Sequence, residues 1–274
     1  MSMSRSRFGV TCAAVILLGA GSASANPRAL PFTYTTDTLA PGNVEIEQFA
    51  DLVPLRALDL NGNGPFLYLA SQYQTESEIG VADRLELGLY FVYVPSRADE
   101  YAPASLAQMP EATGLKQRLR YIFADPGAWP IDVGVYGELT ESSRELELEG
   151  KLLLQRRFDR LRIAANLVAE YELAFTHERE VALNPSLGAT YEVTPSFHAG
   201  VDSWMRAEYS QTLKEPRSFG LGPQYYAGPA VMYNFGKLWW SVGAYLRVSD
   251  TSHEVQPGEA YGRVWFRSMI GYEL

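Results

Sequence analysis

The sequence predicts an all-β protein: a single 12-stranded antiparallel up-and-down transmembrane β-barrel that follows a cleaved signal peptide. Three observations carry this prediction. Twelve segments alternate between apolar and polar residues with the period of two that a strand imposes. Each segment spans ten or more residues, about the length that a tilted strand needs to cross a bilayer. The connections tend to alternate between long and short, as in barrels with loops at one end and tight turns at the other.

The N-terminus has the features of a secretory signal peptide. Arg5 and Arg7 precede a short apolar run over residues 8–20, and small residues then lead to Ala25. This order predicts cleavage after Ala25. We therefore divide the chain into a signal peptide (1–25), a periplasmic lead segment (26–42) and the transmembrane barrel (43–274). The single cysteine, Cys12, lies in the signal peptide, so the mature chain has no thiol and no disulfide.

The charge balance excludes several classes of partner. Loss of Arg5 and Arg7 leaves 21 of the 23 basic residues against 32 acidic ones, a net charge of −11 for the mature chain. Such an acidic chain is not expected to bind nucleic acid or an anionic membrane surface. No mature segment approaches 18 consecutive apolar residues, which argues against membrane-spanning helices. The apolar residues are therefore expected in strands that face the outer-membrane lipids.

The last strand shows the alternation most clearly. Val264, Phe266, Ile270, Tyr272 and Leu274 share one face, while the other face carries the charged residues. Similar patterns mark the other strands, and no linker divides them. The predicted strands are 43–53, 65–81, 85–94, 113–124, 131–141, 144–157, 161–172, 180–193, 197–208, 223–235, 238–248 and 261–274.

The connections indicate a topology. The even-numbered junctions are short and contain turn-forming residues, whereas the odd-numbered ones are longer, except for the fifth. In outer-membrane barrels the turns are periplasmic and the loops extracellular. A multi-pass barrel with an even strand number then has both termini in the periplasm of a Gram-negative cell. A secreted β-sandwich or β-propeller also alternates, but its strands are shorter, typically about five or six residues.

Charges of opposite sign are placed on different strands of the predicted inner face. The first three strands form an acidic wall, the fourth a basic ladder, and the last adds two arginines. In an open pore, neutral residues at Arg118 and Arg120 would raise the preference for cations. Alternatively, these charges pair with one another and fill a closed barrel. The candidate pore-lining residues are Glu45, Glu47, Asp51, Glu76, Glu78, Glu86, Lys116, Arg118, Arg120, Arg263 and Arg267.

Three stretches support a resemblance to known proteins. Strand 261–274 resembles the closing strand of Gram-negative outer-membrane barrels, although Leu274 stands where Phe is most common. This resemblance implies recognition of strand 261–274 by the barrel-insertion machinery. Residues 80–90 and 228–236, with the signal peptide, resemble porin- or transporter-like outer-membrane proteins associated with aromatic-degradation pathways. The resemblance implies uptake of a small solute, which the residues themselves do not identify.

The function predicted is a narrow channel or transporter for small solutes in the outer membrane, as a monomer without cofactors or catalytic residues. One alternative is an outer-membrane hydrolase of the phospholipase or protease type. His198 is the one histidine in a predicted strand, and His177 lies beside acidic residues in a loop. The other alternative is a filled barrel with a structural or surface-binding role. No metal site is predicted, but Asp59, Asn61 and Asn63 resemble half of a calcium loop whose twelfth position is Ala70 rather than Glu.

Overall fold

The computed structural model describes residues 26–58, 65–95, 110–142, 145–175, 179–211, 218–219, 223–249 and 262–274. Its regular elements in these ranges are all strands. None of the described residues forms a helix long and apolar enough to cross a membrane. The strands are β1 (Val44–Leu58), β2 (Pro65–Ala82), β3 (Leu85–Pro95), β4 (Pro110–Ile122), β5 (Asp132–Ser142), β6 (Glu145–Phe158), β7 (Leu161–Ala174), β8 (Arg179–Leu183), β9 (Ser186–Thr194), β10 (Phe197–Gln211), β11 (Ser218–Phe219), β12 (Gln224–Asn234), β13 (Leu238–Arg247) and β14 (Val264–Glu273).

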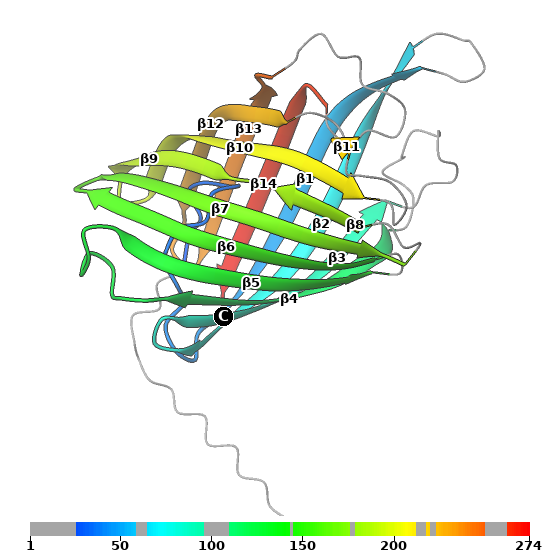
Figure 1. Ribbon diagram of the computed structural model, residues 1–274. Coiled ribbons are helices and arrows are strands. Elements are labelled where there is room, and N and C mark those ends of the chain that lie inside the picture. Colours follow the sequence, from blue (N-terminus) through cyan, green and yellow to red (C-terminus); the bar gives the residue numbers. More distant parts are fainter. Residues whose placement is uncertain are drawn as a thin grey trace, which may run out of the picture.

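These strands form a closed antiparallel barrel of twelve positions, as predicted (Figure 1). Successive positions of the ring pair with each other, and β14 closes the ring on β1, from Glu45 opposite Glu273 to Leu52 opposite Phe266. Closure removes the free edges that an open sheet would expose. The two-residue strand β11 pairs with the end of β10 and lies outside the ring.

The eighth position of the ring is shared by β8 and β9, which the sequence pattern predicted as one strand. The interruption falls at Asn184 and Pro185, because proline has no N–H group to donate to the ladder. The neighbouring strands still contact the break: the Asn184 N–H donates to the Val168 carbonyl, and the Met205 N–H donates to the Pro185 carbonyl. Both pieces pair with β7 and β10, so the ring remains continuous.

The two ends of the barrel differ. At one end, here called the turn end, residues 83–84, 123–131, 159–160, 195–196 and 235–237 connect successive strands. The opposite end is called the loop end. Positive φ angles at Arg84 (64°) and Asp159 (54°) allow two of the connections to be made by two residues.

The outer face is apolar, as the alternation predicts. Trp239 and Trp240 show the two faces: Trp239 is fully buried inside, whereas Trp240 is 48% exposed on the outside. Exposed aromatic residues gather near the turn end, which is typical of the girdle at a membrane interface. These residues are Tyr121, Phe123, Trp129, Phe158, Tyr191, Tyr233, Phe235, Trp240 and Tyr272.

The lead segment, residues 26–42, lies inside the barrel, where Figure 1 shows it as the dark-blue loop. The sequence analysis assigned these residues to a periplasmic lead segment, whereas the structure places most of them in the barrel interior. Most of its residues are buried, and Gly42 N donates to Gly80 O at the turn end. An irregular segment can be buried only where its peptide groups find partners. Polar side chains on the inner faces of the strands supply those partners.

Candidate functional site

Two inner-face side chains bind the peptide groups of the lead segment. Asn166 of β7 accepts a hydrogen bond from the Tyr34 N–H (2.7 Å) and donates one to the Tyr34 carbonyl (2.9 Å). Asp202 of β10 accepts hydrogen bonds from the Phe32 N–H (2.8 Å) and the Thr33 hydroxyl (2.5 Å). The Asn166 and Asp202 side chains are both buried, so they replace the water that these groups would otherwise bind.

Other inner-face groups hold the C-terminal part of the lead segment. Asp37 forms ion pairs with Arg157 and Arg162 near the turn end. The Leu39 N–H donates to a carboxylate oxygen of Glu86 (2.9 Å). Together with the contacts at Asn166 and Asp202, these bonds bind the segment to several different strands. The lead segment is thus an integral part of the barrel interior.

The acidic wall and the basic ladder meet at Arg118. Its Nε atom donates to Glu76 (2.6 Å), one terminal nitrogen donates to Glu86 (2.7 Å), and the other donates to Glu78. Arg120 forms a further ion pair with Glu86 (2.6 Å). The side chains of all five residues are at most 1% exposed. Pairing of this kind is what permits charge to be buried.

A glycine makes room for the Arg118 side chain. A Cβ atom on Gly88 would lie 2.5 Å from Arg118 Nε, and it would also meet Glu76. We therefore expect Gly88→Ala to lower the free energy of unfolding by about 1–3 kcal/mol, because the buried charge cluster must shift. Urea titration of the folded barrel measures this. Gly137→Ala is the matched control, since a Cβ there meets nothing within 4 Å. Equal effects of the two variants would contradict the close-approach argument.

Arg28 of the lead segment extends this charge cluster. It forms an ion pair with Glu47 at 3.3 Å, and its guanidinium lies 3.9 Å from the centre of the Tyr34 ring. Burial lowers the pKa of this guanidinium, but the surrounding groups, which include Tyr34, Glu47 and Glu76, together raise the pKa above its ordinary value. Oxygen atoms of Glu47, Glu76 and Glu78 lie within 4.8 Å of one another. Each of these carboxylates has Arg28 or Arg118 as an ion-pair partner.

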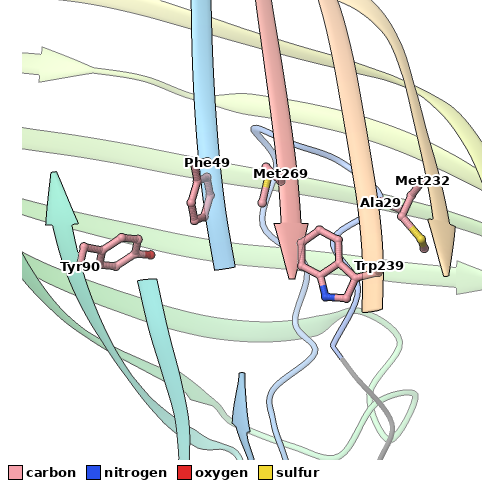
Figure 2. Packing of buried hydrophobic residues seen from close by; sticks show 6 residues of the cluster. All are labelled: Ala29, Phe49, Tyr90, Met232, Trp239 and Met269. Atoms are coloured by element: carbon pink, nitrogen blue, oxygen red, sulfur yellow. The ribbon is translucent and has the colours of Figure 1, made fainter. Parts of the chain in front are cut away.

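Apolar side chains pack beside these charges and fill the turn end. Figure 2 shows Trp239, Met269 and Met232 beside Ala29 of the lead segment, with Phe49 and Tyr90 toward β1 and β3. Trp239 also donates a hydrogen bond to Glu45 (2.5 Å). The lumen at this end is therefore filled by side chains.

A cavity of about 340 Å³ lies between the lead segment and the loop end. Aromatic residues from the lead segment and five strands line it: Phe32, Tyr34, Phe49, Tyr90, Tyr136, Trp204 and Trp265. Phe32 stacks on Trp204 with ring centroids 4.7 Å apart, and Trp204 stacks on Tyr226 at 4.3 Å. Mutual packing of aromatic rings thus accounts for the inward position of Trp204.

Charged groups line the walls of this cavity. They comprise five carboxylates, Glu138, Glu147, Glu149, Glu170 and Glu172, and four cations, Lys116, Lys151, Arg206 and Arg267. Lys116 pairs with Glu138 (2.9 Å) and Lys151 with Glu149 (2.8 Å). Arg206 contacts Glu170, Glu172 and Glu208, and Arg267 pairs with Asp51. Including Asp51 and Glu208, seven carboxylates surround four cations.

The predicted pore-lining residues fall into three groups. Lys116 and Arg267 line the cavity. Arg263 is exposed just before β14. The remaining eight are buried on the inner face below the cavity or beside it: Glu45, Glu47, Asp51, Glu76, Glu78, Glu86, Arg118 and Arg120. Asp51 binds Arg267 and Trp265, whereas the other seven bind one another or the lead segment. The filled-barrel alternative thus describes the turn end, whereas the described residues leave a cavity in the half of the barrel toward the loop end.

Several cavity residues escaped the sequence prediction. Phe32 and Tyr34 lie in a segment without strand alternation, so nothing in their spacing indicated an inward position. Glu147, Glu149 and Lys151 did alternate with apolar residues on β6 and could have been added from that signal. Arg206, likewise, shares the inner face of β10 with Asp202 and Trp204.

The hydrolase and calcium hypotheses gain no site from the described residues. His198 lies on the inner face of β10, opposite Glu192 of β9 and Met232 of β12. His177 falls outside the described residues, as do Asp59, Asn61 and Asn63 of the calcium-like loop. These parts of the two hypotheses stay predictions.

Comparison with solved structures reveals the same fold in outer-membrane channels and porins. The COG4313 outer membrane channel from Pseudomonas putida F1 is 12% identical, with a TM-score of 0.61 over 87% of this chain and 98% of the channel. The KdgM porin, solved in complex with disordered oligogalacturonate, is 9% identical, with a TM-score of 0.50 over 83% of this chain and 98% of the porin. At these identities the likeness establishes the fold.

Sequence comparison adds the family. No curated protein matches this chain. Residues 22–256 match a family described as "Family of unknown function (DUF6662)", which covers most of the chain. This outer-membrane-type β-barrel therefore belongs to the DUF6662 family.

Proposed function

We propose that this protein is a narrow channel for small solutes in the outer membrane, closed at the turn end by its own lead segment. The main evidence for this proposal is that the two halves of the lumen differ. The loop end holds a cavity of about 340 Å³ walled by charged groups, whereas the turn end is filled by residues 26–42 and the Arg118 charge cluster. In this arrangement a solute enters the cavity, and passage requires the lead segment to move.

The apolar outer face and the aromatic girdle support a position in the outer membrane, as does the fold shared with channels and porins. In such barrels the tight turns face the periplasm. The lead segment would then close the channel from the periplasmic side, and the cavity would open to the cell exterior.

The lining charges indicate which solutes the cavity favours. Its carboxylates outnumber its cations, so the field in the lumen attracts positive charge. The aromatic residues that line the cavity add planar apolar surface to its wall. We therefore expect small cations to be preferred over anions, with solutes that carry a planar apolar group favoured among them.

Conductance of the purified protein in a planar bilayer tests the proposal. Discrete current steps with a reversal potential that indicates cation preference are the expected result. A folded, inserted protein that never conducts, including after release of the lead segment, would contradict a channel function.

The contribution of the cavity wall can be measured at Glu147. This side chain lines the cavity, and among the described residues it forms no ion pair. We expect Glu147→Gln to reduce cation preference, because it removes a negative charge from the lumen without leaving a cation unpaired. Reversal potentials in a KCl gradient measure this. Glu141→Gln is the control, since Glu141 is an exposed residue at the same end of the adjacent strand β5, on its outward-facing side. Identical shifts in both variants would mean that Glu147 does not face the ion path.

A further inference from the structure

The backbone nitrogen of Asn26 lies in a binding site on the inner wall of the barrel. It is 3.0 Å from a carboxylate oxygen of Glu45, and the other oxygen of Glu45 accepts a hydrogen bond from Trp239 Nε1 (2.5 Å). Asn26 is 8% exposed and Glu45 is fully buried. Asn26 Nδ2 also donates a hydrogen bond to the carbonyl of Asp37 (3.4 Å).

The surroundings of Glu45 are strongly negative. Glu45 lies opposite Glu273 across the β1–β14 pair and opposite Glu78 across the β1–β2 pair. Like charges in directly opposed positions destabilise a sheet. The buried carboxylates of this region, Glu45, Glu47, Glu76, Glu78, Glu86 and Glu273, number six, against three buried guanidinium groups, Arg28, Arg118 and Arg120.

Glu45 differs from the other buried carboxylates on β1, β2 and β3. Glu47, Glu76, Glu78 and Glu86 each form an ion pair with an arginine. Among the described residues, no cationic side chain forms an ion pair with Glu45. Its two donors are the indole of Trp239 and the nitrogen of Asn26. A buried carboxylate without a cationic partner is destabilising. A positive charge on the Asn26 nitrogen would provide Glu45 with that partner.

We propose that Asn26 is the first residue of the mature protein and that its α-ammonium group binds Glu45 inside the barrel. A signal peptidase supplies this charge by hydrolysing the Ala25–Asn26 peptide bond. One water molecule is consumed: its oxygen joins the Ala25 carbonyl carbon, and the Asn26 nitrogen is released as an amine. The new carboxyl group loses a proton and the amine gains one. Processing therefore converts a neutral amide into the missing cation beside Glu45.

The first test needs no variant. The full chain is expressed with its signal peptide, purified from the outer membrane and analysed by N-terminal sequencing and intact mass. The mature chain is expected to start at Asn26, and any other start overturns the proposal. An amine-reactive acylating reagent is then applied to folded and to unfolded protein. The N-terminal peptide should be labelled many-fold more slowly in the folded barrel, and equal labelling rates overturn the proposal.

The second test separates the charge from the packing. One serine is inserted between Ala25 and Asn26, which displaces the α-ammonium group by one residue. The thermal unfolding temperature is expected to fall by about 5–10 °C, since a buried ion pair is broken. In a Glu45→Gln background the same insertion should change the unfolding temperature far less. An equal loss in both backgrounds would show that the insertion acts by steric hindrance and would overturn the ion pair.

Asn26→Ser serves as the matched control for the second test, because it alters the side chain and retains the α-ammonium group. It is expected to lower the unfolding temperature by much less than the insertion does. None of these readouts depends on conductance, so they remain decisive if the barrel proves not to be a channel.

Discussion

Replacing Arg118 with methionine is expected to lower the free energy of unfolding of the barrel by about 3–5 kcal/mol, the range for breaking a buried ion pair. Arg118 forms ion pairs with Glu76, Glu78 and Glu86, and it also donates a hydrogen bond to the Tyr90 hydroxyl (2.9 Å). Methionine fills much of the same volume without the charge. The three buried carboxylates would then have Arg28 and Arg120 as their nearest cations.

Urea titration of the purified barrel, followed by tryptophan fluorescence, measures this loss. Lys116→Met is the matched control, because Lys116 lies on the same face of β4 and, within the described part of the chain, forms one ion pair, with Glu138. Its side chain is 19% exposed, so water compensates part of the lost interaction and the cost should be clearly smaller. Equal costs at the two positions would show that the Arg118 cluster is no more stabilising than one pair at the edge of the cavity.

The same geometry revises an expectation drawn from the sequence. Neutral residues at Arg118 and Arg120 were expected to raise cation preference if both arginines lined an open pore. Both side chains are instead buried against Glu78 and Glu86, outside the cavity lining. Substitution of Arg118 or Arg120 is therefore expected to change mainly the stability of the barrel. Ion selectivity is expected to depend on cavity-lining groups such as Glu147.

The sequence predicts the barrel well because strand alternation encodes it directly. A side chain on a strand can face only inward or outward, and the lipid requires the outward face to be apolar. Strand β13 illustrates this, since the successive residues Trp239 and Trp240 fall on the inner and the outer face. The interruption between β8 and β9 was also encoded, in Pro185, although the pattern was interpreted as one strand.

The lead segment could not be predicted in the same way. Its residues follow no period of two, and its proline and threonine residues are equally typical of an exposed linker. The lead segment is held inside the barrel by partners that are distant in the sequence, Asn166 and Asp202. The pairing of Arg118 with Glu76, Glu78 and Glu86 has the same origin: single-strand patterns identified each charge, but only the strand pairing brings them together.

Releasing the lead segment is expected to open the channel. In the double variant Asn166→Ala, Asp202→Ala, the segment loses both hydrogen bonds at Tyr34 and those at the Phe32 N–H and the Thr33 hydroxyl. If the net loss is about 3 kcal/mol, the ratio of open to closed barrels rises by roughly 100-fold. The measurement is single-channel recording of wild-type and variant proteins, with the open probability and the size of the current steps as readouts.

Asn184→Ala provides the control for this experiment. Asn184 lines the cavity and donates to Glu170, and none of the hydrogen bonds described for the lead segment involves it. A rise in open probability confined to the double variant would identify residues 26–42 as the element that closes the lumen. If the double variant stays folded and its open probability matches the wild type, another part of the barrel must close the path. The Arg118 cluster would then be the remaining candidate, because it fills the turn end independently of Asn166 and Asp202.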